Sequence, residues 1–375
     1  MTAVENALIV GGGTAGLTAA IALRRAGVEA EIVEVKDDWT VLGSGVTFMS
    51  ATIRALAALG LGESFVERGA GGSEVGIFDA VGNKLETVPV PRLAGPELPS
   101  VGGIMRQALH EMLVAAAEAE HTPVRLGVTV ASLTAGNGRV EATLDNGEQG
   151  EYDLVIGADG IHSRVRELIF GGEYHPRFTG QSVWRAVVPR PADHLEPEMF
   201  YGASVKAGIN AVSDSQAYLF LTENTQATTR PPRDEWPRLI RELLAEFAGP
   251  VAEVREQITE PDKVDCRPLQ ALLVPLPWHV GRVVLIGDAA HASTPQLAMG
   301  AGLAIEDSIV LAQELESSES VEEALTNFGQ RRFERCRMVV ENSVQLGEWE
   351  QHPDDPDADP GGLSGSSWAA LAEPI

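Results

Sequence analysis

Cysteine is scarce in this sequence. Its 375 residues include only two cysteines, Cys266 and Cys336, which stand far apart and form no CxxC spacing. This pattern excludes a disulfide framework and a cysteine-based zinc site.

Long hydrophobic runs are also missing. No stretch approaches the roughly 18 consecutive apolar residues that a membrane-spanning helix needs. The strand-like residues 7–10 begin too early for a secretion signal to precede them. We therefore expect a cytoplasmic protein that neither crosses nor binds a membrane.

Basic residues are few relative to acidic ones. The chain has 28 Lys and Arg against 54 Asp and Glu, a formal net charge of −26, which would repel nucleic acid and anionic lipid. In contrast, 44% of the residues are hydrophobic. A chain of this length and composition can bury a large core, and it predicts two domains rather than a disordered protein.

The first 35 residues alternate in type. A strand at residues 7–10 is followed by a glycine run, and the next segment predicts a helix with Leu17 and Ile21 on one face. Gly27 stands where a helix would end, and residues 28–33 predict a second strand. This order is that of a βαβ unit.

The glycine run at residues 11–16 satisfies the pattern GxGxxG between a strand and a helix. Gly11 permits the tight turn, Gly13 lets the backbone approach a pyrophosphate, and Gly16 lets helix and strand pack closely, with Ala15 inside the same turn. Glu34 ends the second strand, where a carboxylate can accept hydrogen bonds from an adenosine ribose. The loop alone leaves NAD and FAD open, as well as a glycine-rich turn without a ligand. No second GxGxxG occurs, so only one dinucleotide is predicted to have a Rossmann site.

Further along the chain the pattern changes twice. Helices are predicted over residues 50–60, with Ser50 as N-cap, and over 104–119; short strands follow up to 156, and a strand-rich unit covers about 172–230. Two long helices, over about 301–316 and 321–349, end the globular part. Residues 352–375 are acidic and rich in Pro and Gly, so we expect a mobile tail, with a docking arm as the alternative.

Two buried strands run directly into polar turns. Asp159 and Gly160 follow the first, before a basic segment that contains Arg164 and Arg166. Gly287 and Asp288 follow the second. Ligands of open α/β sheets bind at such carboxyl ends of strands. For the nearby acid pair Glu306 and Asp307 we expect a solvated or backbone-bonded helix face, and for His291 a packed loop position rather than a proton carrier.

These three motifs in this order resemble the single-component flavoprotein monooxygenases, the family of para-hydroxybenzoate hydroxylase and salicylate hydroxylase, over residues 6–349. The resemblance implies an α/β fold in which a Rossmann-like FAD-binding domain carries an inserted β-sheet-rich substrate domain. The implied FAD-binding domain comprises residues 1–71, 101–171 and 276–349, the substrate-binding domain residues 72–100 and 172–275, and the acidic tail residues 350–375.

The resemblance also implies roles for individual residues. Asp159 would lie beside FAD, Gly287 and Asp288 would bind the ribityl chain, and Arg106 would reach the diphosphate or ribityl region. The remaining implied contacts are Val130 at the adenine and, around the isoalloxazine ring, Gly45, Val46, Pro295, Ala298, Gly300, Ala301 and Gly302. Ala298 stands where glycine is frequent in the family, and Val35 stands where Arg is commoner.

The activity that the resemblance implies is hydroxylation of a small phenolic or N-heteroaromatic compound with NADH or NADPH and O2, through a flavin C4a-hydroperoxide. Candidate substrate-binding residues are Thr47, Trp184, Lys206, Asn210, Tyr218 and Gln296, and candidate catalytic residues are Tyr218, Gln296 and Pro295. Arg164 and Arg166 are candidate contacts for the nicotinamide diphosphate. A monomer or homodimer is expected. A related enzyme with a non-aromatic substrate and a catalytically silent FAD-binding protein remain the alternatives.

Overall fold

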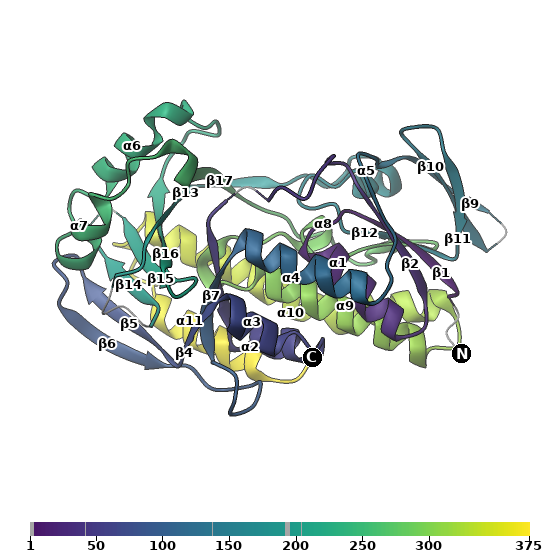
Figure 1. The fold of residues 1–375 in the computed structure, drawn as a ribbon, viewed down its shortest axis with the longest axis horizontal. Coiled ribbons are helices and arrows are strands. Elements are labelled where there is room, and N and C mark those ends of the chain that lie inside the picture. The colour runs from purple at the N-terminus through teal and green to yellow at the C-terminus, as the bar shows by residue number, and fades with distance from the viewer. Residues whose placement is uncertain (1–3, 42, 137, 192–195, 204) are drawn as a thin grey trace.

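The computed structural model describes residues 4–41, 43–136, 138–191, 196–203 and 205–375. The molecule has two lobes, each built around a β-sheet, and long helices run between them (Figure 1). The lobe on the right in Figure 1 contains the N-terminal strand β1, and the lobe on the left contains helices α6 and α7.

The first lobe is built on a six-stranded sheet in which neighbouring strands are parallel, except that β18 pairs antiparallel with β19. The predicted βαβ opening is confirmed by β1, α1 and β2. In spatial order the strands are β18 (His279–Val280), β19 (Val283–Leu285), β12 (Leu154–Gly157), β1 (Asn6–Val10), β2 (Glu29–Glu34) and β8 (Val124–Leu126).

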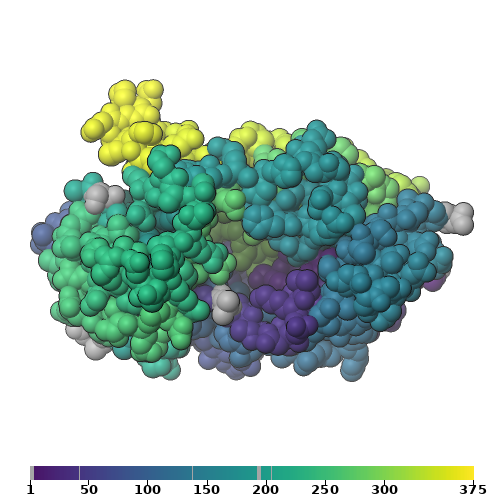
Figure 2. Space-filling model, turned by 90° about the horizontal axis from the view of Figure 1, so that it is seen from above, coloured from purple at the N-terminus to yellow at the C-terminus, as the bar shows by residue number. Residues whose placement is uncertain are grey.

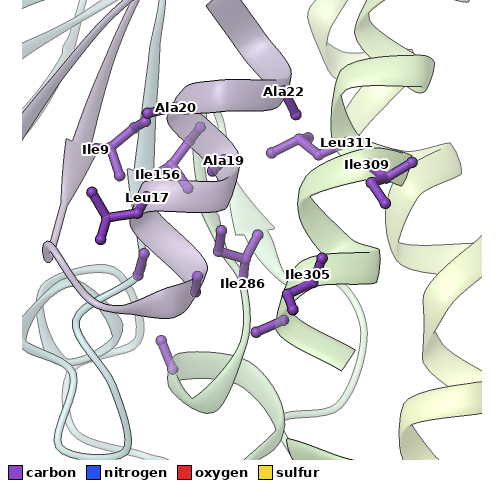
Figure 3. Close-up of a cluster of buried hydrophobic side chains, with 14 of the residues drawn as sticks. Ile9, Leu17, Ala19, Ala20, Ala22, Ile156, Ile286, Ile305, Ile309 and Leu311 are labelled. Carbon is purple, nitrogen blue, oxygen red and sulfur yellow. The ribbon is translucent and has the colours of Figure 1, made fainter. Parts of the chain in front are cut away.

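Helix α1 (Thr14–Arg25) is buried between this sheet and helix α9 (Gly300–Ser317), as Figure 3 shows for Ile9, Leu17 and Ile305. Small side chains on α1 let the two helices approach closely. The hydroxyl groups of Thr18 on α1 and Ser308 on α9 lie 2.8 Å apart in a hydrogen bond. This bond fixes the first half of α1 relative to the middle of α9.

The other helices pack beside the sheets and along the length of the molecule (Figure 1). Residues 101–105 form a strand rather than the start of the predicted helix, which begins at Arg106. Ser50 is the first helical residue of its helix and does not cap it, because the N-cap position is Met49. The helices are α2 (Ser50–Ala58), α3 (Gly62–Arg68), α4 (Arg106–Ala119), α5 (Arg164–Phe170), α8 (Asp288–His291), α10 (Val321–Gln351) and, in the second lobe, α6 (Trp236–Leu243) and α7 (Gly249–Arg255).

Two small antiparallel sheets complete the first lobe. One consists of β11 (Gln149–Tyr152), β10 (Arg139–Leu144) and β9 (Val130–Gly136). The other consists of β3 (Gly45–Met49), β7 (Val101–Met105) and β4 (Ala70–Gly72), and it leads the chain toward the second lobe.

The second lobe is a seven-stranded mixed sheet with two different faces. Because side chains alternate along a strand, Trp184 and its alternate neighbours point to one face, where they form an apolar core with Ile240 of α6 and Val251 of α7. The other face carries polar and charged side chains and points toward the first lobe. The strands in spatial order are β17 (Val264–Ala271), β13 (Arg177–Pro189), β16 (Gln216–Asn224), β15 (Lys206–Ala211), β14 (Glu198–Tyr201), β5 (Glu74–Asp79) and β6 (Lys84–Pro89).

The C-terminal segment differs from the mobile tail that its composition predicted. Residues Pro360–Ala372 form helix α11, and Leu371 is buried. Arg54 of α2 donates hydrogen bonds to the carbonyl oxygens of Leu371, Ala372 and Glu373, which are among the carbonyls that a helix leaves unpaired at its C-terminal end. Charged donors at these carbonyls explain why an acidic, Gly-rich segment is ordered here.

Within the described residues, no helix combines the length and the apolar composition that spanning a membrane requires. Cys266 and Cys336 are both buried and unbonded to another cysteine, as the sequence predicts.

Candidate functional site

A hollow lies between the two lobes, with N-terminal residues (purple) visible inside it (Figure 2). The carboxyl ends of the parallel strands β1, β12 and β19 each lead into one of the three motifs found in the sequence. The structure therefore brings these motifs together at one edge of the sheet, where ligands of open α/β sheets bind.

The glycine loop leaves the N-terminal end of α1 free. Gly11 has φ +108°, and a β-carbon there would lie 2.5 Å from the Ala158 carbonyl oxygen. A β-carbon on Gly16 would lie 1.9 Å from the Gly11 carbonyl oxygen, whereas one on Gly13 would meet nothing within 4 Å. Gly13 is the N-cap residue of α1, and no side chain caps it. The first amide groups of the helix can therefore bind an anion such as a phosphate.

Glu34 lies beside this loop. Its carboxylate accepts hydrogen bonds from the amide nitrogens of Gly12 (2.7 Å) and Lys36 (3.0 Å). These bonds fix the side chain at the end of β2, with further lone pairs available for ribose hydroxyl groups.

The Gly287–Asp288 motif packs directly against the glycine loop. Gly287 has φ +57°, and a β-carbon there would lie 3.0 Å from the Ala15 side chain. The next residue, Asp288, is exposed to the cleft, and no group in the described part of the chain donates a hydrogen bond to its carboxylate. The protein atoms around the cleft limit the hydration of the Asp288 carboxylate and so raise its pKa, while His291 and Arg106 act in the opposite direction.

The loop before α9 provides a second free helix end. Ala298 adopts a left-handed conformation (φ +53°), which explains why glycine is frequent at this position in the family. Helix α9 starts at Gly300, and no side chain caps it. A β-carbon on Gly302 would lie 2.2 Å from the Thr52 hydroxyl oxygen. Two uncapped helix ends and an unpartnered carboxylate, Asp288, fit a ligand with a diphosphate and several hydroxyl groups, such as FAD.

Arg106 stands on the opposite side of the cleft. Its guanidinium makes no hydrogen bond or ion pair with the described residues, and burial together with the nearby Arg267 lowers its pKa. Asp265, Tyr218 and Asp288 are its other charged or titratable neighbours. An unpaired and largely desolvated cation of this kind is suited to bind an anionic group.

A polar cluster joins the two lobes next to Arg106. The Thr47 hydroxyl of β3 and the Tyr218 hydroxyl of β16 lie 2.5 Å apart, and the Asn210 amide of β15 donates hydrogen bonds to both. The other end of this amide, Asn210 Oδ1, is buried and has no hydrogen-bond partner among the described residues. We call these three residues the hydroxyl cluster; all three were predicted from the sequence to bind substrate.

A second polar cluster lies along the same sheet face. Glu350 of α10 forms an ion pair with Lys206 and accepts hydrogen bonds from Gln181 (3.1 Å) and Thr222 (3.1 Å). Gln296 donates a hydrogen bond to Gln181 (3.0 Å), and its Oε1 atom is buried with no hydrogen-bond partner in the part of the chain that the structure describes. Despite burial, the ion pair raises the pKa of Lys206 and lowers that of Glu350. The sequence predicted Lys206 and Gln296 as substrate-binding residues. Glu350, which it did not predict, contacts both of them.

Some predicted site residues do not face the cleft. Trp184 is buried in the apolar core of the second lobe, where it packs against Trp236 and donates a hydrogen bond to Glu223 (2.7 Å). Its side chain therefore lies on the face of the sheet opposite the hydroxyl groups of the cleft. The Val130 side chain is 1% exposed and belongs to the core of the first lobe, so only its main chain is available to a ligand.

The basic segment after β12 also differs from expectation. The Arg166 guanidinium is buried and donates hydrogen bonds to the carbonyl oxygens of Tyr174, Ala289 and Ile161, so it is not free to bind a nicotinamide diphosphate. Asp159 accepts hydrogen bonds from the Ser163 hydroxyl (2.5 Å) and the Arg164 amide (2.6 Å). Its carboxylate thus holds the start of α5.

The expectation of a solvated face for Glu306 and Asp307 is wrong, whereas its backbone-bonded form holds for Asp307, which accepts a hydrogen bond from the Gly287 amide. Both carboxylates have 0% exposure and are paired with arginine side chains. His291 is packed, as expected, but its ring also contacts the Asp307 carboxylate at 2.6 Å.

Sequence reasoning missed several residues that line the sheet face in the cleft. They come from β13, β16 and β17 and lie on the same side of the sheet as Tyr218 and Asn210, opposite the apolar core. The alternation of apolar and polar residues along β13 and β17 was the available signal. These residues are Arg185, Phe220, Asp265 and Arg267.

Comparison with known proteins agrees with this site. The FAD binding domain family matches residues 5–343. The chain is 31% identical to 2-heptyl-3-hydroxy-4(1H)-quinolone synthase of Pseudomonas aeruginosa over 92% of this chain and 90% of that protein. It is 29% identical to salicylate hydroxylase of Pseudomonas putida, over 91% of this chain and 85% of that protein.

A solved structure shows the same fold. Klebsiella pneumoniae HpxO, in complex with FAD and uric acid, superimposes with a TM-score of 0.83 at 22% identity, covering 99% of this chain and 93% of that one. The chain therefore belongs to the FAD binding domain family. Within it, this protein is a flavoprotein monooxygenase with FAD as its cofactor, and the predicted fold, similar to that of para-hydroxybenzoate hydroxylase, is confirmed.

Proposed function

We propose that this protein hydroxylates a small phenolic or N-heteroaromatic compound in the cleft between the two lobes, with NADH or NADPH and O2 as co-substrates. The observation that carries the proposal is the hydroxyl cluster of Thr47, Asn210 and Tyr218, which lies beside Arg106, a side chain that is also close to Asp288.

FAD would lie along the edge of the six-stranded sheet. The free amides of α1 at Gly13 would bind the diphosphate, Glu34 the ribose, and Asp288 the ribityl hydroxyl groups. Gly11, Ala15 and Gly16 allow the close packing of this loop. Bound FAD supplies the redox chemistry of the reaction, taking hydride from the nicotinamide and activating O2. The amides at the start of α9 (Gly300, Ala301 and Gly302), the preceding residues Pro295 and Ala298, and Gly45 and Val46 of β3 would surround the flavin ring.

The substrate would bind against the second lobe. Tyr218 is buried, and its hydroxyl group can both donate and accept a hydrogen bond, so it can hold a phenolic oxygen of the substrate. Asn210 Oδ1 lacks a partner and would accept a hydrogen bond from an O–H or N–H group of the substrate. Gln296 Oε1 offers a second acceptor next to Pro295.

The cleft wall also has an excess of positive charge. Arg106, Arg185 and Arg267 gather around one carboxylate, Asp265, which lies 2.8 Å from Arg267 and 3.9 Å from Arg185. In a chain of net charge −26 this local excess attracts anions to the cleft. It would favour FAD and the ionised form of a phenolic substrate, which is the electron-rich form that an electrophilic hydroxylation needs.

The nicotinamide co-substrate would bind transiently, since the sequence contains a single Rossmann fingerprint. Arg164 remains a candidate contact because 46% of its side chain is exposed, whereas Arg166 is not available.

The test is a turnover assay with a panel of aromatic compounds. Salicylate, named as the compound that one relative hydroxylates, belongs in the panel, together with an alkylquinolone that lacks the 3-hydroxyl group of the other relative's product, hydroxypyridines and simple phenols. We expect one class to accelerate NADH or NADPH oxidation and to yield a product that carries one atom of ¹⁸O from ¹⁸O₂. Protein that fails to retain or take up FAD would contradict the proposal. FAD-bound protein whose NAD(P)H oxidation no compound changes would indicate a catalytically silent FAD-binding protein.

A pair of variants tests the role of Tyr218. Tyr218→Phe removes only the hydroxyl group in the cleft, so we expect the substrate KM to rise about tenfold, the value of one hydrogen bond, with FAD affinity unchanged. Tyr174→Phe, a change of the same kind outside the cleft, should leave KM unchanged.

A further inference from the structure

The buried pair Glu306 and Asp307 belongs to a cluster of charged side chains that the proposed reaction does not use. Arg332 of α10 lies between the two acids, at 2.9 Å from Glu306 and 2.8 Å from Asp307. Arg335 binds both oxygens of Glu306 at 2.8 Å, and His291 of α8 contacts Asp307 at 2.6 Å. We call these five residues the buried charge cluster.

The two acids of the cluster have different partners. Among the described residues, the Glu306 carboxylate is bonded to Arg332 and Arg335 alone, and through Arg335 it is connected to the carbonyl oxygens of Ala370 and Leu371 in α11. Asp307 reaches in the other direction, where its Oδ2 atom accepts a hydrogen bond from the Gly287 amide nitrogen at 2.9 Å. Only Asp307 therefore touches the turn that carries Asp288.

The Gly287 turn needs such a support. Its backbone is in the left-handed region, and a β-carbon there would lie 3.0 Å from Ala15 and 3.1 Å from Ala304. The turn thus fits tightly between α1 and α9, and its buried amide would lose a hydrogen bond if the Asp307 carboxylate moved. Arg332 and His291 hold this carboxylate from two other sides.

We propose that Asp307 is the positioning residue of the FAD site: it fixes the Gly287 amide and thereby the place of the Asp288 carboxylate. Arg332 and His291 fix Asp307 in turn. Glu306 instead connects α9 to α10 and, through Arg335, to α11. This inference rests on the proposed role of Asp288 in binding FAD.

A metal ion is not the reason for this cluster. The ligand atoms of His291, Asp307 and Cys336 lie within 4.8 Å of one another, which is a metal-like spacing. However, the Arg332 guanidinium already contacts both Asp307 and, at 3.7 Å, the Cys336 sulfur. The positively charged guanidinium of Arg332 therefore occupies the position that a metal ion would need.

The neighbouring acid provides a matched control for the experiment. Asp307→Asn and Glu306→Gln each remove one buried negative charge that is paired with Arg332, but only the first changes the contact to Gly287. We expect Asp307→Asn to weaken FAD binding at least about tenfold, measured by titrating apoprotein with FAD and following flavin fluorescence. Glu306→Gln should lower the thermal midpoint of the apoprotein and leave the FAD dissociation constant within about twofold of the wild-type value. Equal FAD affinities of wild type and Asp307→Asn, or an equal loss in both variants, would overturn the inference.

FAD titrations of the wild-type apoprotein and of Asp288→Ala distinguish a failure of this inference from a failure of the proposed function. If wild-type apoprotein binds no FAD, or if Asp288→Ala binds it normally, the proposed site itself is wrong. If Asp288→Ala loses affinity and Asp307→Asn does not, only the positioning role fails. Should Asp307→Asn not fold, His291→Gln replaces it, since this change affects a partner of Asp307 that does not touch Glu306. We expect it to weaken FAD binding more than Glu306→Gln does, and an equal effect of the two would refute the positioning role.

Discussion

Gly45 and Tyr218 touch across the two lobes. A β-carbon on residue 45 would lie 2.4 Å from Tyr218 Cδ1 and 2.5 Å from the Val212 side chain. Glycine at this position therefore lets β3 approach the sheet of the second lobe and sets the place of the Tyr218 ring.

We predict that Gly45→Ala displaces Tyr218 and impairs substrate binding. Overpacking of this kind destabilises proteins by about 1 to 3 kcal/mol, which urea unfolding would detect. The substrate KM should rise at the same time, because the Tyr218 hydroxyl leaves its position beside Thr47. Gly365→Ala is the control: a β-carbon there meets nothing within 4 Å, and the site is an exposed helix position. An unchanged KM in Gly45→Ala would contradict the role of this contact.

The glycine loop allows a second prediction, in which two glycines of one motif behave in opposite ways. Gly13→Val should lower the stability of the apoprotein only slightly, because its β-carbon points into open space and valine is merely a poorer N-cap than glycine, but it should abolish FAD binding by filling the place of the diphosphate. Gly16→Ala should instead destabilise the apoprotein, because its β-carbon would lie 1.9 Å from the Gly11 carbonyl oxygen. The measurements are thermal unfolding without FAD and FAD titration. Retention of FAD by Gly13→Val would show that the loop does not hold the diphosphate.

The attachment of α11 leads to a third prediction. Arg54 donates to three carbonyl oxygens at the end of this helix and Arg335 to two, so Arg54→Ala should loosen the segment 360–375 without freeing it entirely. We expect faster hydrogen exchange and faster proteolysis in this segment, with a loss of about 1 to 3 kcal/mol in the free energy of unfolding. Arg238→Ala is a suitable control, because within the described part of the chain Arg238 pairs with the exposed side chains of Glu235 and Glu242 and does not contact α11. If both variants exchange alike, Arg54 does not hold α11.

The sequence predicted those parts of the site that depend on short motifs. The GxGxxG loop, Glu34 and the Gly287–Asp288 turn are local in sequence, and their geometry follows from glycine conformations and strand ends. The partners of Glu306 and Asp307 could not be found in this way, because Arg332 and Arg335 follow more than 20 residues later on another helix. A helical acid pair looks the same in sequence whether it faces water or buried arginines.

The same limit applies to the second lobe. Lys206, Asn210 and Tyr218 could be nominated from strand patterns, but Arg185 and Glu350 join the site only through tertiary packing. For Trp184, the strand alternation placed the side chain on one of two faces without indicating which face is the core. The order of α11 could not be predicted from composition either, since it depends on arginines from α2 and α10.

The last prediction concerns the pH dependence of stability. Burial would raise the pKa of Asp307, but His291 and Arg332 outweigh this effect and lower it to about 2 from the usual 3.8. A carboxyl group whose pKa is lower in the folded state stabilises the fold above its unfolded pKa, and this contribution disappears as the pH falls through the folded pKa. We therefore expect Asp307 to contribute about 2 kcal/mol at neutral pH, lost between roughly pH 4 and pH 2. The check is the free energy of unfolding of wild type and Asp307→Asn as a function of pH. The difference between the two proteins should shrink across this acid range, and a difference that stays constant down to about pH 2 would show that the Asp307 carboxylate is not held ionised by its partners.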